Sequence, residues 1–228
     1  MERLVEILRE FSPEEINEIE RNDRQFKALE RLYERFKERE EEFYRLVLIN
    51  ALMSYQLQMK GEEYWEKFAE FFSNSKGMED FEEFLKRFNR RFLSAKLKRL
   101  KKAIDCVSQI KVEQVRDAGQ LVEELAKCMG QRKDSKTIVF AVKMLNYAVK
   151  VAEGDELEGL EEIAIPLDSR IGRISKDRDF WRKLSEKTGI LQIKLDAIFW
   201  ICQNEEHLKS LPEELRMKLE KVRERIFG

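Results

Sequence analysis

The chain has 228 residues, 39% of them charged, and a formal net charge of −1 at pH 7. With only 3 Pro and 9 Gly, it has few of the residues that end helices, so its composition favours helix. The near-neutral total gives no indication of a nucleic-acid partner, and no apolar stretch approaches the ~20 residues that a membrane span requires. We therefore expect a helical intracellular protein, cytoplasmic and without a membrane partner.

Apolar residues recur with helical spacing from the start of the chain. Ser12, Pro13 and Glu15 are typical of a helix start, with the serine as the cap and the glutamate reaching back to it. Helical periodicity runs from there to Phe36, then resumes over 43–59 and stops at Gly61. Further helices are expected at 62–72, 78–88, 93–107 and 120–129.

The charge is unevenly distributed. Residues Lys86–Lys102 include nine basic side chains and no acidic one, whereas 38–42 and 153–162 are acidic. A concentrated basic segment in a neutral protein could hold a phosphate backbone. A solvated helix face that pairs with nearby acids would give the same pattern, and both interpretations stay open.

The helix expected at 136–152 has two different faces. One face is apolar; the other alternates cations and rings through Lys136, Phe140, Lys143, Tyr147 and Lys150. Rings beside cations can stack a base and hold phosphates. A partly exposed face whose lysine stems cover apolar surface is the alternative.

A short polar hairpin precedes this helix. Residues 129–135 contain Gly130 and join the helix at 120–129 to the one at 136–152, which makes a helix, a hairpin and a helix. Such a hairpin can present backbone N–H groups to a DNA phosphate. Because a helix N-terminus disfavours the ammonium form, Lys136 at this position suits a nucleophilic amine.

The remaining signals follow the acidic loop 153–162. Asp168 comes two residues after Pro166 and opens a short helix near 169–174, where it would act as a capping carboxylate. Further helices are expected at 179–188, 190–203 and 212–226, and His207 is expected at the surface near a helix end. No run alternates with period two, so the prediction is an all-α fold.

Three cysteines, Cys106, Cys128 and Cys202, are far apart in the chain. Their spacing suits neither zinc nor an iron–sulfur cluster, and an odd number argues against a secreted disulfide framework. We expect them to be small buried apolar residues.

Gly130 and Lys136-Thr137, followed by the stretch from Pro166 to Arg170, resemble the helix-hairpin-helix DNA glycosylase superfamily, in which a lysine and an aspartate occur in this order. More closely, the chain resembles the archaeal 8-oxoguanine DNA glycosylases. The matching stretches are Asn50-Ala51-Leu52, Ser54-Tyr55, Gly61-Glu62-Glu63 with Trp65, Leu145-Asn146-Tyr147-Ala148, and Leu195-Asp196 with Trp200. The hairpin departs from the superfamily by having Asp134 where a left-handed residue is expected.

The resemblance implies an all-α helix-hairpin-helix glycosylase fold. It implies a single domain over 1–228, with two helical subdomains and the active-site cleft between them. We expect one subdomain to comprise 1–55 with 189–228, and the other to comprise 56–188, with the helix-hairpin-helix at about 120–152. The four-cysteine cluster of some relatives is absent, and neither a metal ion nor another cofactor is implied.

The resemblance also implies a set of site residues. Lys136 would be the nucleophile and Asp168 the assisting carboxylate. Base recognition is expected from Gln25, Trp65, Phe140, Lys143, Asp196 and Trp200. Contacts with the DNA backbone are expected from Gly130, Arg132, Lys133 and Ser135.

The expected activity is excision of 8-oxoguanine from double-stranded DNA with associated strand cleavage. Single-stranded DNA as a substrate and another damaged base stay open, and nothing in the sequence demands more than a monomer. A non-catalytic helical DNA-binding module is the first alternative, and a structural domain that binds no DNA is the second.

Overall fold

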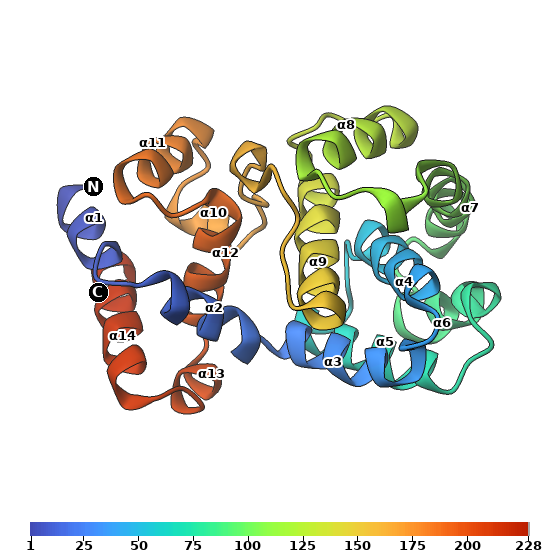
Figure 1. Cartoon of the computed structure of the whole chain (residues 1–228), viewed down its shortest axis with the longest axis horizontal. Coiled ribbons are helices and arrows are strands. Elements are labelled where there is room, and N and C mark those ends of the chain that lie inside the picture. Colours follow the sequence, from blue (N-terminus) through green and yellow to red (C-terminus); the bar gives the residue numbers. More distant parts are fainter. Residues whose placement is uncertain (228) are drawn as a thin grey trace. The chain divides into compact units, whose positions relative to one another are not determined.

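The computed structural model describes residues 1–227, apart from the side chain of Glu113. Within these residues the regular secondary structure consists of α-helices and short 3-10 turns, and Asp117 forms an isolated bridge with Glu158 (Figure 1). The prediction of an all-α fold is confirmed. No helix of the described chain combines the length and the apolar character that crossing a membrane requires.

The contacts divide the chain into two compact units. Unit 1 comprises residues 1–23 and 163–228, and unit 2 comprises residues 24–162. The subdomain boundaries expected from the sequence lie elsewhere, at 55/56 and 188/189. The difference has a packing reason, because α3 (Arg24–Phe36) packs on α5 (Gly61–Ser73) and α9 (Lys136–Glu153), so its residues belong to unit 2.

Unit 1 is built around α12 (Gln192–Ile201), which packs on its neighbours α2, α11 and α14. Trp181 and Phe199 meet there at 5.3 Å between ring centroids. The predicted capping box at Ser12 is confirmed, since its hydroxyl accepts from Glu15 N at 3.2 Å. The other helices of the unit are α1 (Glu2–Leu8), α2 (Pro13–Asn22), α10 (Ile171–Ile174), α11 (Arg178–Thr188), α13 (Glu205–Lys209) and α14 (Glu213–Phe227).

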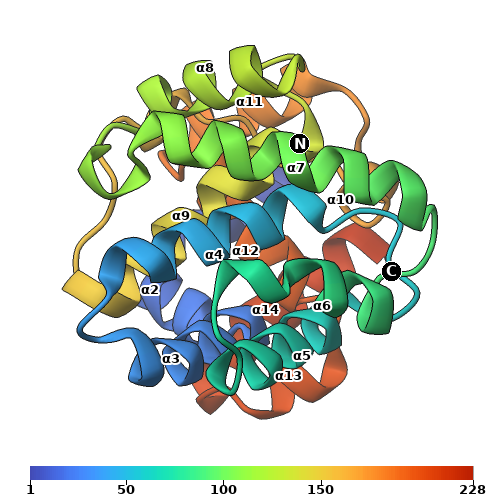
Figure 2. The ribbon, with the colours of Figure 1, turned by 90° about the vertical axis from the view of Figure 1, so that its right-hand side faces the viewer.

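Unit 2 is built around α4 (Glu40–Met53), whose residues from Phe43 to Met53 are buried except for the half-buried Arg45. This burial follows from its position, since α4 packs on α9 and on α7 (Leu93–Ile110) (Figure 2). A cluster of phenylalanine rings joins α5 to α6 (Phe81–Phe88), including Phe72 and Phe81 at 4.6 Å. The remaining helix of unit 2 is α8 (Ala118–Met129).

Several helix ends differ from the sequence prediction. The helical run expected from Ser12 to Phe36 is broken at Asp23, which is extended (φ −61°, ψ 129°). The helix expected over 43–59 ends at Met53. The Ser54 hydroxyl donates to Asn50 O at 2.7 Å and Gln56 has a φ of 49°, so the chain turns away.

His207 is buried, and its predicted surface position is wrong. It lies in α13, a short helix that the sequence prediction did not include, and is 5% exposed. Asn204 caps this helix by accepting from the backbone N–H groups of Glu206 and His207. The histidine therefore belongs to the interior of unit 1.

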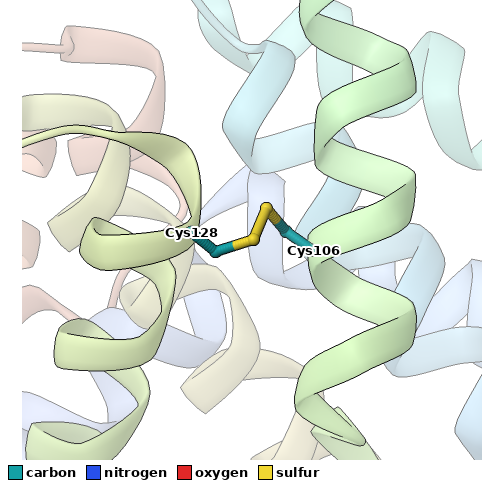
Figure 3. Close-up of a disulfide and its surroundings, with 2 residues drawn as sticks. All are labelled: Cys106 and Cys128. Atoms are coloured by element: carbon teal, nitrogen blue, oxygen red, sulfur yellow. A yellow bond between two sulfur atoms is a disulfide. The ribbon is translucent and has the colours of Figure 1, made fainter.

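Two cysteines that were expected to be separate apolar residues form a disulfide. Cys106 on α7 and Cys128 on α8 are bonded across 22 residues of chain (Figure 3). The prediction was wrong for this pair because the packing of α7 on α8 determines the proximity of the two side chains. Cys202 is a free buried cysteine, as predicted.

Replacing both cysteines by alanine is expected to lower the free energy of unfolding by about 3 kcal/mol, because the bond closes a loop of this length in the unfolded chain. Urea denaturation of the wild type and of Cys106→Ala/Cys128→Ala would measure the difference. Adding a reductant should destabilise the wild type by a similar amount and leave the double variant unchanged. Equal urea midpoints for the wild type and the double variant, both measured without reductant, would contradict the expectation.

Candidate active site

The hairpin between α8 and α9 turns at Gly130. This glycine has a φ of 64°, a left-handed conformation that glycine adopts without steric cost, and Gln131 N donates to Ala126 O at 2.9 Å. Asp134, expected at a left-handed position, is not among the described residues with positive φ. The hairpin therefore makes its turn with one left-handed residue, at the end of α8.

The basic side chains of the hairpin have acidic partners. Arg132 bonds to both carboxylate oxygens of Asp134 at 3.0 and 2.7 Å, and Lys133 pairs with Glu123. Ser135 is the N-cap residue of α9 but makes no side-chain capping bond. Both basic side chains are exposed in these pairs, so they stay accessible to a phosphate.

Helix α9 presents Lys136 at its first position, where the side chain is exposed. Along the same face, Phe140 is half-buried, and Lys143 and Tyr147 are only 2% and 1% exposed. The alternative of a partly exposed lysine face is therefore wrong beyond the first turns. A buried lysine needs compensating interactions, and the Lys143 Nζ lies 5.2 Å from the centre of the Tyr147 ring.

Three helices of unit 2 bring several predicted recognition residues together. Trp65 on α5 meets Phe140 on α9 edge to face, with ring centroids 6.2 Å apart. On α3, Phe26 meets Tyr147 of α9 at 5.2 Å. Gln25, next to Phe26, is 3% exposed. The side chains singled out on α3, α5 and α9 thus lie on helices that pack on one another.

The indole of Trp65 has an unused hydrogen-bond donor. Its Nε1 is buried and has no hydrogen-bond partner among the described residues. Buried polar groups in folded proteins nearly always have a partner, and an exception calls for an explanation such as a bound ligand. A donor held in this way by aromatic neighbours suits the carbonyl oxygen or ring nitrogen of a base.

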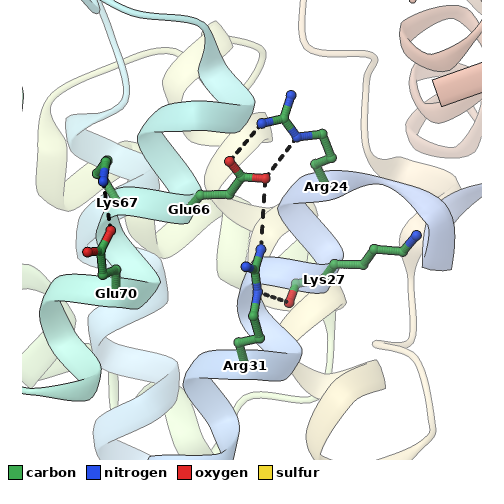
Figure 4. Close-up of polar contacts among 6 residues, drawn as sticks. All are labelled: Arg24, Lys27, Arg31, Glu66, Lys67 and Glu70. Atoms are coloured by element: carbon green, nitrogen blue, oxygen red, sulfur yellow. Dashed lines mark hydrogen bonds and ion pairs between the residues drawn. The ribbon is translucent and has the colours of Figure 1, made fainter. Parts of the chain in front are cut away.

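An ion pair that the sequence did not reveal holds α3 to α5 beside these residues. Arg24 bonds to both carboxylate oxygens of Glu66, at 2.8 and 2.7 Å (Figure 4). Hydrogen bonding to Glu66 raises the pKa of Arg24. Since Gln25 follows Arg24 and Trp65 precedes Glu66, this bidentate pair links the two helices next to both predicted recognition residues.

In unit 1, Asp168 has the predicted capping role. Its Oδ1 accepts from Arg170 N and from Ile171 N, both at 2.8 Å, and α10 begins at Ile171. Both bonds end on the same oxygen, so the cap does not use Oδ2. The two bonds hold the carboxylate group in one orientation.

Arg170 joins Asp168 to Trp200 within unit 1. Its backbone N–H bonds to Asp168, and its guanidinium carbon lies 3.7 Å from the centre of the Trp200 ring. The Trp200 Nε1 is buried without a hydrogen-bond partner in the described part of the chain. One turn earlier on α12, Asp196 is 4% exposed. The sequence analysis gave Arg170 no role, although it ends the stretch from Pro166 that carries the family resemblance.

The residues expected to act are thus divided between the two units. Those of unit 2 are Gln25, Trp65, Lys136, Phe140 and Lys143, with the hairpin residues 130–135. Those of unit 1 are Asp168, Asp196 and Trp200. Among the side chains that the structure describes, no three from His, Cys, Asp or Glu form a group that could hold a metal ion.

Comparison with known proteins gives the family. The model of the family described as "AGOG: N-glycosylase/DNA lyase" matches residues 5–226. The chain belongs to the AGOG family. An N-glycosylase/DNA lyase of Nanoarchaeum equitans is 39% identical over 94% of this chain and 94% of its own. One of Thermococcus kodakarensis is 34% identical over 96% of this chain and 92% of its own.

A solved structure supports the same assignment. The crystal structure of Pa-AGOG, an 8-oxoguanine DNA glycosylase from Pyrobaculum aerophilum complexed with 8-oxoguanosine, is similar to this chain with a TM-score of 0.84 and 30% identity. The similarity covers 96% of this chain and 95% of that one. The resemblance inferred from the sequence is confirmed, and the helix-hairpin-helix is part of an AGOG fold.

Membership in the AGOG family makes the chain an N-glycosylase/DNA lyase that acts on damaged DNA. The two non-enzymatic alternatives, a DNA-binding module and a structural domain, are therefore not supported.

Proposed function

We propose that this chain excises 8-oxoguanine from duplex DNA and cleaves the strand, with Lys136 as the nucleophile. The observation that carries the proposal is the arrangement on α9, where the exposed Lys136 lies one turn before Phe140, which contacts the unpaired indole of Trp65. The similarity to a glycosylase solved with 8-oxoguanosine supports the choice of base.

Base removal begins with the damaged nucleotide outside the duplex, because its sugar carbon cannot be reached within the base stack. The neutral amine of Lys136 forms a bond to C1′ while the bond from C1′ to the base nitrogen breaks. The base leaves with the bonding electrons and takes up a proton, and the lysine nitrogen loses one. Opening of the sugar ring then gives a Schiff base between Lys136 and C1′.

Strand cleavage follows from the Schiff base. Its positive charge acidifies the protons on C2′, and loss of one of them is followed by departure of the 3′ phosphate. This β-elimination breaks the carbon–oxygen bond at C3′. Lys136 is therefore used in both steps, which is the reason why one residue supports a combined glycosylase and lyase.

Asp168 is proposed to stabilise the positive charge that develops on the sugar, or to assist proton transfer. Two backbone N–H groups hold its Oδ1, so the carboxylate is oriented before substrate binds. Because Oδ2 is not used by the cap, this oxygen is the one assigned to the substrate.

Recognition of the base is proposed to use both polar and aromatic side chains. Gln25 offers an amide to the Watson–Crick edge of a purine, and the Trp65 indole offers a donor. Phe140 and Trp200 supply ring faces for stacking, and Lys143 and Asp196 supply opposite charges. Backbone contacts are proposed at the hairpin, from Gly130, Arg132, Lys133 and Ser135.

The choice of base is tested with duplexes that carry a single 8-oxoguanine or an unmodified guanine at the same position. We expect the single-turnover rate of base release to be at least about a hundredfold higher for 8-oxoguanine, since a site that hydrogen-bonds a base rejects an analogue lacking the matching groups. A duplex with a different damaged purine serves as a second comparison. Equal or faster release of that purine would contradict the assignment.

A further inference from the structure

Arg99, on α7, bonds to one residue within the hairpin and to one in the first turn of α9. Its Nη2 donates to Gln131 Oε1 at 2.7 Å and to Thr137 Oγ1 at 3.2 Å. Thr137 Oγ1 in turn donates to Gln131 Oε1 at 3.2 Å. One guanidinium therefore joins Gln131, two residues beyond the end of α8, to Thr137, the second residue of α9 and the neighbour of Lys136.

The same side chain is anchored on the opposite side. Arg99 Nε donates to Leu52 O at 3.1 Å, near the end of α4, and the guanidinium carbon lies 5.4 Å from the centre of the Tyr55 ring. The planar guanidinium has donors that point in fixed directions. Arg99 thus links the beginning of α9 to α4, the most buried helix of unit 2.

The chemistry of these contacts is unusual for a half-buried cation. The acceptors of Arg99 are a carbonyl, an amide and a hydroxyl, all of them neutral. Burial lowers the pKa of Arg99, so the surroundings disfavour its charge. Local features that cost stability are expected at functional sites, and this one lies beside the first turn of α9.

We propose that Arg99 is a positioning residue for the nucleophile, holding the first turn of α9 through Thr137 and Gln131 so that the Lys136 amine is fixed relative to the sugar. This inference rests on the proposed role of Lys136. Nucleophilic attack depends steeply on geometry, and a displacement of about 1 Å can lower the rate a hundredfold. Arg99 does not itself touch the reacting atoms.

The test measures single-turnover release of 8-oxoguanine from duplex DNA over a range of excess enzyme concentrations. This gives a limiting rate and a half-saturating concentration separately. The variants are Arg99→Gln, Arg99→Lys, Thr137→Val and the double variant Arg99→Gln/Thr137→Val. Arg35→Gln, which removes an exposed arginine of α3 in the same unit, is the matched control.

We expect Arg99→Gln to lower the limiting rate at least about tenfold, with a change in half-saturating concentration below about threefold. Arg99→Lys should recover part of the loss. The double variant should be no slower than Arg99→Gln alone, because both changes break the same link. Arg35→Gln should match the wild type.

Two results would overturn the inference while leaving the proposed function intact. The first is an Arg99→Gln protein that changes only the half-saturating concentration or the unfolding temperature. The second is a double variant whose loss equals the product of the two single losses. If Arg99→Gln does not fold, the limiting rates of Arg99→Lys and Thr137→Val, which change the fold least, are compared with that of the wild type. Wild-type limiting rates in both variants would then overturn the inference. A wild type that releases no 8-oxoguanine would instead overturn the proposed function, and this inference with it.

Discussion

Lys136→Gln is expected to lower the single-turnover rates of base release and strand cleavage by at least about a thousandfold, because an amide cannot attack C1′ or form a Schiff base. The side chain is exposed at the start of α9, so the substitution removes no buried contact and the fold should be retained. Release of 8-oxoguanine and cleavage of an end-labelled duplex would be measured in parallel, since both steps need the same nitrogen.

The matched control is Lys127→Gln, an exposed lysine on α8 in the same unit. Lys127→Gln should release the base and cleave the strand at the wild-type rates. The affinity of Lys136→Gln for the damaged duplex should stay within about threefold of the wild-type affinity, since one exposed charge contributes little to it. Residual strand cleavage by Lys136→Gln above a thousandth of the wild-type rate would point to a different lysine.

Asp168→Asn is expected to lower the limiting rate of base release by roughly 10²–10⁴-fold, the usual contribution of a charge or proton donor at the reacting centre. Asparagine retains an oxygen that can accept from Arg170 N and Ile171 N, so the cap of α10 should remain. The loss should therefore appear in the rate, with little change in the unfolding temperature.

Asp177→Asn provides the control for this effect. Asp177 caps α11 in the same unit by accepting from Asp179 N at 2.9 Å, so the substitution makes the same chemical change at another helix start. Its base-release rate should equal that of the wild type. If both variants lost activity to the same degree, Asp168 would be a cap only, and the catalytic carboxylate would have to be sought elsewhere.

The helical fold could be predicted because period-3.6 patterns and capping residues are local. The box formed by Ser12 and Glu15 is an example, and it was confirmed. The end of α4 was missed because it depends on distant partners. Met53 O accepts from Asn89 and Gln56 O accepts from Lys96, so the chain leaves the helix where Leu57 and Met59 would have continued its apolar pattern.

The site was predictable only in part for the same reason. Lys136 and Asp168 could be predicted as site residues because they belong to stretches that resemble a known family. Glu66 and Arg99 have no such signature, since they act through bonds to other elements, to Arg24 and Thr137. Arg170 ends a stretch with the resemblance, but its contact with the Trp200 ring cannot be read from the sequence. The disulfide was missed because the packing of α7 on α8 cannot be read from the spacing of cysteines.

Borohydride trapping detects the Schiff base between Lys136 and DNA, because its reduction leaves a covalent bond between the lysine and the sugar. Wild-type protein incubated with borohydride and an 8-oxoguanine duplex is predicted to form a protein–DNA adduct, and neither an unmodified duplex nor Lys136→Gln should give one. An adduct that survives in Lys136→Gln would assign the nucleophile to another lysine, with Lys143 the first to test. Absence of any adduct and of base release with the wild type would exclude catalysis through a lysine Schiff base and favour a helical protein that binds DNA without reacting with it.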